Sequence, residues 1–168
     1  QEGVFWPCPT EDHPGTPRLF TERFGHPDGR ARFHPVEYTP AAEEPGGEYP
    51  FRLTTGRVIY HYLSGNQTRR LGYLNSQAPD VWVELHPQAA DRLGIRSDDT
   101  VRVRTPRGSM ELKAVVVPTI RPDTLFIPFH YGHHQAVNQL TNSAVEPTVK
   151  IPEYKACAAA IERLDVRP

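Results

Sequence analysis

The sequence predicts a mainly β domain with short helices (α+β), preceded by an extended segment. Residues 100–105, TVRVRT, alternate polar and apolar side chains, as a half-buried strand does. The Pro-Arg-Gly-Ser turn at residues 106–109 leads into a second apolar run at residues 110–117, which predicts a hairpin. Residues 1–38, by contrast, are rich in Pro, Gly, His and Arg and show neither helical nor strand periodicity.

The N-terminal segment, residues 1–38, carries large apolar side chains outside any regular pattern, so we expect it to lie extended against another body. Residues 26–29, HPDG, predict a turn, with glycine at the position that tolerates positive φ. Residues 31–36 are expected to form a short strand.

A linker is expected at residues 39–50, TPAAEEPGGEYP, which hold three Pro, two Gly and three Glu. The adjacent Glu43 and Glu44 are interpreted as a solvated charge pair of this linker rather than as catalytic carboxylates. The predicted division is therefore a segment at 1–38, a linker at 39–50 and a domain at 51–168.

The first half of the domain contains two strands and a helix. The apolar run at residues 51–53 predicts the end of one strand, and VWVEL at residues 81–85 predicts another with an acid facing outward. Residues 86–94 predict a short helix, because Pro87 suits its first turn and Gly94 its C-terminal end.

Two later segments complete the domain. DTLFIPF at residues 123–129 predicts an apolar strand. YKACAAAIERL at residues 154–164 is ambiguous: its alanines favour a helix, whereas the alternating Cys157, Ala159 and Ile161 favour a strand.

The composition excludes several classes of function. A chain of 168 residues can bury a core without disulfides, and a net charge of −1 with a pI near 6.8 gives no support for nucleic-acid or membrane binding. Cys8 and Cys157 lie far apart, and without a Cys-x-x-Cys the chain carries no iron–sulfur or structural zinc signature. We expect a reducing, cytoplasmic setting. The chain starts at Gln1 without a secretory signal, and we expect it to be a piece of a longer protein.

The most informative stretch is residues 54–70, TTGRVIYHYLSGNQTRR. It combines Gly56 and Gly65 with hydroxyls, an amide, a histidine and three arginines. Glycine lets backbone approach a ligand closely, and arginine offers a planar fork of donors that suits phosphate. We interpret this stretch as a loop that holds an anionic cofactor with several rings.

The common nucleotide and nucleophile motifs are missing. The sequence has neither Gly-x-Gly-x-x-Gly nor a Gly-Lys-Ser/Thr phosphate loop, which disfavours Rossmann and P-loop folds. It also lacks Gly-x-Ser-x-Gly, and Cys157 in its alanine-rich run is interpreted as a buried packing residue rather than a nucleophile.

Two later clusters add polar groups. His130, His133 and His134 follow one another within residues 129–134 in a spacing that no usual metal site has, so we expect a loop that lines a cofactor or substrate pocket and no metal ligand. NQLTN at residues 138–142 offers amides suited to the edges of a heterocycle, although an Asn-capped turn is the simpler interpretation of this run alone.

Together these features resemble the C-terminal cofactor-binding domain of the molybdopterin oxidoreductases, the superfamily that includes nitrate reductases and formate dehydrogenases. Residues 3–38 look like the tail of the preceding catalytic domain, closest to assimilatory nitrate reductases and related formate-dehydrogenase-like proteins. The matching residues in the domain are LTTGR at 53–57 with His61 and 68–70, HPxxA at 86–90, LGI at 93–95, DTVRV at 99–103, and NxLT at 138–141 with Pro152, Tyr154, Lys155, Cys157 and Ala158.

The resemblance implies a six-stranded double-psi β-barrel, in which residues 154–164 contain a strand. It places Phe129 near a substrate-side aromatic of nitrate reductases, and it implies that the catalytic metal ligand lies outside this chain. The cofactor-binding residues that it implies are Thr55, Gly56, Arg57, Val58, His61, Ser64, Asn138 and Lys155.

The resemblance also implies the cofactor, molybdopterin guanine dinucleotide, present in the full enzyme as molybdenum bis-(molybdopterin guanine dinucleotide), with any iron–sulfur cluster in the upstream part. The expected partners are the remainder of the catalytic subunit and an electron donor or acceptor. The expected reaction of the full enzyme is reduction of nitrate to nitrite, and this chain alone is not expected to be active. Three alternatives stay open: a formate dehydrogenase, a stand-alone cofactor-binding subunit, and a non-catalytic barrel used for interaction.

Overall fold

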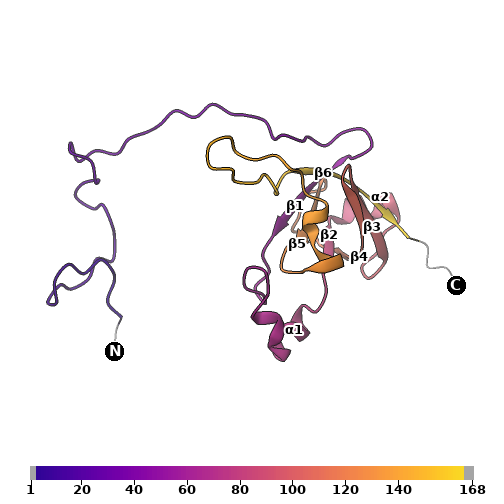
Figure 1. Ribbon diagram of the computed structural model, residues 1–168, viewed down its shortest axis with the longest axis horizontal. Helices are drawn as coiled ribbons and strands as arrows, with labels where there is room; N and C mark the ends of the chain where they lie inside the picture. Colours follow the sequence, from indigo (N-terminus) through magenta and orange to yellow (C-terminus); the bar gives the residue numbers. More distant parts are fainter. Residues whose placement is uncertain (1–2, 165–168) are drawn as a thin grey trace. The chain divides into compact units, whose positions relative to one another are not determined.

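The computed structural model describes residues 3–164 of the chain, and the chain separates into two units, Gln1–Thr39 and Pro40–Pro168 (Figure 1). Residues 165–168 of the domain predicted at 51–168, and residues 1–2 of the first segment, lie outside the described residues. The division into a catalytic-domain tail, a linker and a binding domain stays a prediction.

The first unit is an extended segment with turns, as expected. The turn at residues 26–29 is present: Gly29 has φ +70°, and its N–H donates to the carbonyl of His26 at 2.8 Å. The strand expected at residues 31–36 is wrong, because this stretch pairs with no other strand among residues 3–164. An extended backbone without a partner forms no ladder of hydrogen bonds.

The second unit is a closed barrel of six strands in the order β1-β5-β2-β4-β3-β6 (Figure 1). The β1/β5 and β2/β4 pairs are parallel and the other four are antiparallel. This mixed barrel confirms the predicted mainly β fold, a six-stranded double-psi β-barrel. The strands are β1 (Phe51–Gly56), β2 (Trp82–Leu85), β3 (Thr100–Thr105), β4 (Gly108–Val116), β5 (Thr124–Pro128) and β6 (Cys157–Arg163).

The barrel core follows from the alternation of side chains along each strand. Buried and partly exposed residues alternate in β1 and β3, because neighbouring side chains of a strand point to opposite faces. The inward side chains form one apolar cluster. Its members with no exposed surface include Leu53, Val83, Leu85, Val101, Val103, Leu125, Ile127 and Cys157.

The alanine-rich tail is a strand, as the resemblance implied. β6 pairs antiparallel with both β1 and β3, so its pairing partners override the helical preference of alanine. Cys157 and Cys8 are both free thiols. Cys157 is a buried packing residue, and burial raises the pKa of its thiol.

The short helices lie outside the barrel wall. Helix α2 (Pro87–Leu93) was predicted: the His86 ring accepts from the backbone N–H of Gln88 at 3.1 Å, and Gly94 ends the helix with φ +64°. Helix α1 was not predicted, since its six residues include no buried one. The remaining helices are α1 (Gly72–Gln77) and three 3₁₀ helices, η1 (Thr68–Arg70), η2 (His133–Gln135) and η3 (Val137–Gln139).

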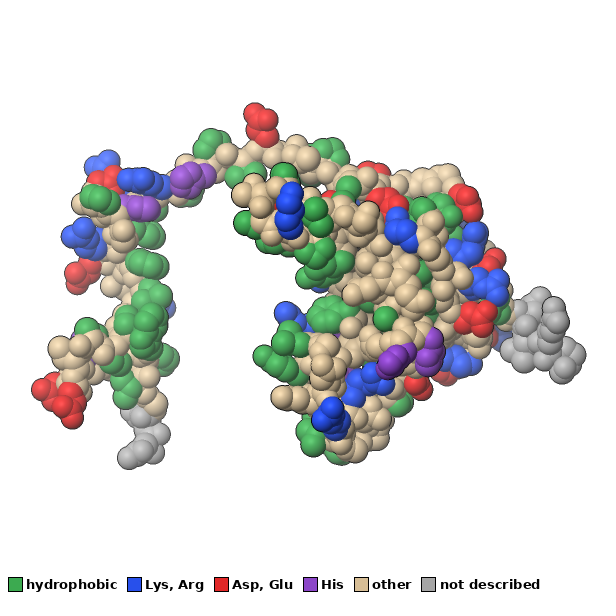
Figure 2. Space-filling view, in the orientation of Figure 1, with side chains coloured by type: hydrophobic (Ala, Val, Ile, Leu, Met, Phe, Trp, Pro, Cys, Tyr) green, Lys and Arg blue, Asp and Glu red, His purple; other side chains and the backbone are tan. Residues whose placement is uncertain are grey.

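Acidic and basic side chains are interspersed over the barrel surface (Figure 2). On β3, Arg102 contacts Glu111 of β4 at 2.9 Å and Glu162 of β6 at 3.3 Å, so charge pairs cross the sheet. Within residues 3–164, the structure contains no helix long and apolar enough to cross a membrane.

Candidate functional site: a cavity at the end of the barrel

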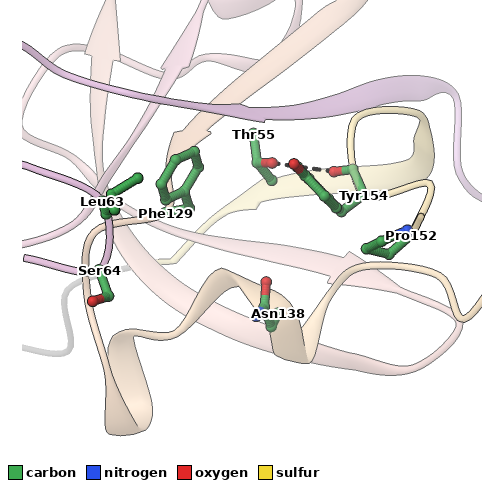
Figure 3. A pocket seen from close by; sticks show the side chains of 7 residues that line it. All are labelled: Thr55, Leu63, Ser64, Phe129, Asn138, Pro152 and Tyr154. Carbon is green, nitrogen blue, oxygen red and sulfur yellow. Dashed lines mark hydrogen bonds between the residues drawn. The ribbon is translucent and has the colours of Figure 1, made fainter. Parts of the chain in front are cut away.

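A cavity of about 350 Å³ opens where the end of β1 meets η3 and the loop before β6 (Figure 3). Its volume lies at the lower end of the roughly 300–1,000 Å³ that small-molecule sites occupy. Leu63 and Ser64 lie at one end of the cavity, and Pro152 and Tyr154 lie at the other. The lining residues are Thr55, Leu63, Ser64, Phe129, Asn138, Pro152 and Tyr154.

Two reciprocal hydrogen bonds join β1 to the segment before β6. The hydroxyl of Thr55 donates to the carbonyl of Tyr154 at 3.2 Å, and Nζ of Lys155 donates to the carbonyl of Thr55 at 2.6 Å. Thr55 is buried, whereas Lys155 remains exposed. The ammonium group of Lys155 therefore lies beside the cavity, fixed by the strand end and open to a negatively charged ligand.

The loop after β1 is held by His130, which has no exposed surface. Its Nε2 accepts from the backbone N–H of Val58 at 2.8 Å, and its Nδ1 donates to the carbonyl of Leu63. A carbonyl can only accept, so this pair of bonds fixes one neutral tautomer. Burial lowers the pKa of His130, and the nearby His61 and Arg57 lower it further, which favours the same neutral ring.

His61 does not line the cavity. Its buried ring bonds protein groups that follow it in the chain. Its Nε2 donates to the carbonyl of Ala78 at 2.8 Å, and its Nδ1 lies 3.2 Å from the hydroxyl of Thr68. Tyr131 donates to the same Ala78 carbonyl at 2.9 Å, and burial raises the pKa of this phenol to about 12. Both ring nitrogens of His61 are thus engaged by the protein.

Gly65 closes the loop where no side chain fits. Its φ is +74°, and a Cβ built on it would lie 2.6 Å from the carbonyl oxygen of His130. Both facts require glycine, because left-handed backbone strains L residues and this neighbour is backbone that cannot swing away.

The structure brings some of the sequence-predicted residues together and separates others. Thr55, Ser64, Asn138 and Phe129 line the cavity, and Lys155 borders it. A second, open cavity of about 360 Å³ adjoins the other side of the β1 end. It is lined by Arg57 and Val58 with Thr54, Glu84, Thr119, Ile120 and Phe126. Gly56 lines neither cavity, but a Cβ built on it would lie 2.5 Å from the Phe126 ring.

Sequence reasoning missed Leu63 and the role of His130. No local sequence pattern marks Leu63. Its side chain lines the cavity and its carbonyl accepts from His130, and both contacts exist only because the loop folds over the cavity. The histidine cluster was noted as a possible pocket lining, but the structure divides it: His130 is buried under the loop, whereas His133 and His134 are exposed. The partners of His130 lie 72 and 67 residues away in sequence, beyond the reach of pattern analysis.

The free polar groups at the cavity suit an anionic ring system. Within residues 3–164, no hydrogen bond engages the hydroxyl of Ser64 or the side-chain amide of Asn138. Phe129 and Tyr154 add aromatic surface, and Lys155 adds a positive charge. The cavity therefore offers a hydroxyl, an amide and aromatic rings, with a cation at its border. These groups match a ligand that has a heterocycle and phosphate.

Comparison with known proteins now assigns the chain to a family. A family model described as "Molydopterin dinucleotide binding domain" matches residues 51–158, which include every residue that lines the cavity. This chain belongs to that family. The match covers the barrel from β1 into β6.

The similar curated proteins are much longer enzymes. The chain is 43% identical over 161 residues to the assimilatory nitrate reductase catalytic subunit of Bacillus subtilis (strain 168), covering 95% of this chain and 23% of that protein. It is 41% identical over 163 residues to the F420-dependent formate dehydrogenase 1 subunit alpha of Methanococcus maripaludis, covering 97% of this chain and 24% of that protein. The chain thus spans about a quarter of these relatives.

A solved structure shows the same fold. Acetylene hydratase from Pelobacter acetylenicus superposes with a TM-score of 0.62 at 20% identity, over 70% of this chain and 19% of that one. The family and the relatives together support the predicted cofactor, molybdopterin guanine dinucleotide.

Proposed function

We propose that the chain is the C-terminal cofactor-binding portion of a molybdenum oxidoreductase that holds bis-(molybdopterin guanine dinucleotide). The observation that carries the proposal is the cavity that Thr55 and Asn138 line and that Lys155 borders, three residues from separate segments of the chain. Lys155 balances phosphate charge, and the amide of Asn138 pairs with an edge of guanine or pterin. When bound, the metal cofactor supplies the electron transfer, and these residues only hold and orient it.

The predicted contacts divide into direct and supporting ones. Thr55, Ser64, Asn138 and Lys155 face or border the cavity, so we propose them as direct contacts. Arg57 and Val58 line the neighbouring cavity, where Arg57 is an exposed cation for a second part of the same ligand, and we propose that Gly56, just before them in the chain, lets the backbone approach it. We propose that His61, whose ring nitrogens both bind protein groups, supports the loop from behind.

Reduction of nitrate to nitrite is the reaction proposed for the full enzyme. The 43% identity to an assimilatory nitrate reductase catalytic subunit supports it, and Phe129 at the cavity is proposed to face the substrate. The second candidate is a formate dehydrogenase, because the identity to one such subunit is 41%. A cytoplasmic location, an upstream iron–sulfur cluster and an electron-transfer partner belong to the same proposal.

The remainder of the catalytic subunit is the proposed partner. The loop and α1 region between β1 and β2 exposes large apolar side chains, and Ile59 is 92% exposed. A group of exposed apolar side chains on one segment is typical of a surface that another domain or protein covers. The exposed residues are Ile59, Tyr60, Tyr62, Leu63, Leu71 and Tyr73.

Binding of guanosine diphosphate to the chain tests the proposal, since this nucleotide carries the guanine and phosphate groups of the cofactor. Calorimetric titration should show binding, and Lys155→Met and Asn138→Ala should each weaken it about tenfold, as loss of one hydrogen bond to a charged or ring group does. Arg70→Met, an exposed arginine that lines neither cavity, is the matched control. Equal affinities in all four proteins would contradict the assignment of the cavity.

A further inference from the structure

The segment that joins the barrel from the N-terminal side, residues 40–50, is fastened to it at several points. We call these residues the connector. The backbone N–H of Ala42 donates to the carboxylate of Glu153 at 2.9 Å. Three connector acids bind arginines of the barrel: Glu43 binds Arg107, Glu44 binds Arg52, and Glu48 binds Arg104. The connector is therefore part of the barrel structure.

Glu43 differs from the other two acids. It is not the solvated linker charge that the sequence suggested: its side chain is 20% exposed, against 50% for Glu44 and 61% for Glu48. Both carboxylate oxygens bind Arg107, at 2.7 and 2.9 Å. This bidentate pair lowers the pKa of Glu43.

The same carboxylate fills a gap in the barrel wall. Pairing between β3 and β6 ends at Arg104 and Ala160. Two residues earlier in β6, the backbone N–H of Ala158 donates to Oε2 of Glu43 at 2.9 Å. Glu43 thus supplies the acceptor that a neighbouring strand does not supply at this point.

Arg107 extends the contact to the segment that carries Asn138. Its Nε and Nη2 donate to the carbonyl of Leu140 at 3.2 and 3.0 Å. Leu140 is fully buried and ends η3, the 3₁₀ helix that contains Asn138. The other partner of Glu43, Ala158, lies shortly after the cavity residue Tyr154 in the chain. Glu43 and Arg107 therefore hold the two late segments that form one wall of the cavity.

We propose that Glu43 is a positioning residue for the cofactor cavity, acting through Arg107 and the Ala158 N–H on the segments that carry Asn138 and Lys155. We call the group of Glu43, Arg107, the Leu140 carbonyl and the Ala158 N–H the Glu43 clasp. The inference rests on the proposed function for the identity of the ligand. It makes the connector, which does not line the cavity, a determinant of how well the cavity binds.

The test compares Glu43→Gln with Glu44→Gln in the 168-residue chain. Both changes remove one connector charge, but only the first breaks the clasp. In Glu43→Gln, hydrogen exchange should be at least tenfold faster for amides in residues 138–142 and 156–158, with the β1 and β5 amides unchanged. Guanosine diphosphate should bind about threefold to tenfold more weakly. Glu44→Gln should match the wild type in both measurements.

A second variant separates positioning from general loss of stability. Arg107→Lys keeps the positive charge but loses the planar fork, so it should give the same local exchange pattern. Faster exchange throughout the barrel in both variants, or unchanged exchange at residues 138–142, would overturn the positioning role. If hydrogen exchange becomes faster only at residues 138–142 and 156–158 in the two variants, but the wild type does not bind guanosine diphosphate, the result would support the Glu43 clasp and overturn the proposed function. The two failures are therefore distinguishable.

Discussion

At the scale of single residues, a few buried polar side chains shape the loop that borders the cavity. His130 binds this loop at Val58 and again at Leu63, and His61 binds it through Thr68. Gly65 lets the loop close directly over the backbone of His130. The loop residues at the cavity are thus placed by buried side chains that do not line it, as binding groups commonly are.

Replacing Gly65 by alanine should destabilise the chain by at least about 1–2 kcal/mol. The positive φ alone costs an L residue about that much, and the contact with the His130 carbonyl adds to it. Urea unfolding measures the difference. Gly72→Ala is the matched control: it begins α1 with no atom near its Cβ position, so the change should be neutral or slightly stabilising.

Replacing His130 by phenylalanine should cost about 1–3 kcal/mol at pH 7.5, because it leaves the Val58 N–H and the Leu63 carbonyl without a partner. It should also flatten the dependence of stability on pH. The folded-state pKa of His130 is lowered, so the unfolded chain binds this proton first as the pH falls below about 6.5. The contribution of the neutral ring is therefore present at neutral pH and is lost on acidification.

Unfolding free energies at pH 7.5 and pH 5 measure that prediction. The wild type should lose more stability over this interval than His130→Phe, and the difference between the two proteins removes the effect of the other histidines. Equal slopes would mean that His130 takes up its proton alike in both states, in conflict with its burial.

At the scale of elements, tertiary partners decide what local sequence leaves open. The hairpin of β3 and β4 and the helix α2 were predictable, because alternation, a tight turn, Pro87 and Gly94 are local signals. β6 was not predictable from composition alone: alanine favours a helix, and pairing with β1 and β3 makes it a strand. The ion pairs of the connector could not be predicted, because its acids find their arginines only in the folded barrel.

Exchanging the connector, residues 40–50, for a Gly-Ser segment of equal length should destabilise the barrel by about 2–4 kcal/mol. Most of this loss comes from the half-buried Arg107 and the Ala158 N–H, since hydrogen bonds to charged groups contribute about 1.5–3 kcal/mol. The exposed Glu44 and Glu48 pairs add little.

The control is a second variant in which the Gly-Ser segment carries Glu at position 43. Urea unfolding measures the stability of both variants. The second variant should recover at least half of the lost stability, because the Glu43 clasp is then complete. No recovery would assign the stabilisation to the remaining connector contacts instead.

At the scale of the whole molecule, the chain carries a closed barrel of the molybdopterin dinucleotide-binding family and spans about a quarter of its curated relatives. The barrel and the family could be predicted from residues dispersed over the sequence. Of these, Thr55 and Asn138 line one cavity and Lys155 borders it. The division of the predicted residues between two cavities, and the hydrogen bonds of His61 and Glu43, could not be predicted. They depend on contacts between residues far apart in the chain.

We propose that the cavity between β1, η3 and the segment before β6 holds the nucleotide of a molybdopterin dinucleotide. Amide chemical shifts of the isotope-labelled chain, followed during titration with guanosine diphosphate, test it most directly. We expect saturable shifts at Thr55, Ser64, Asn138 and Lys155, and little change along β3 and β4. Shifts confined to other faces of the barrel, or none at millimolar nucleotide, would contradict it.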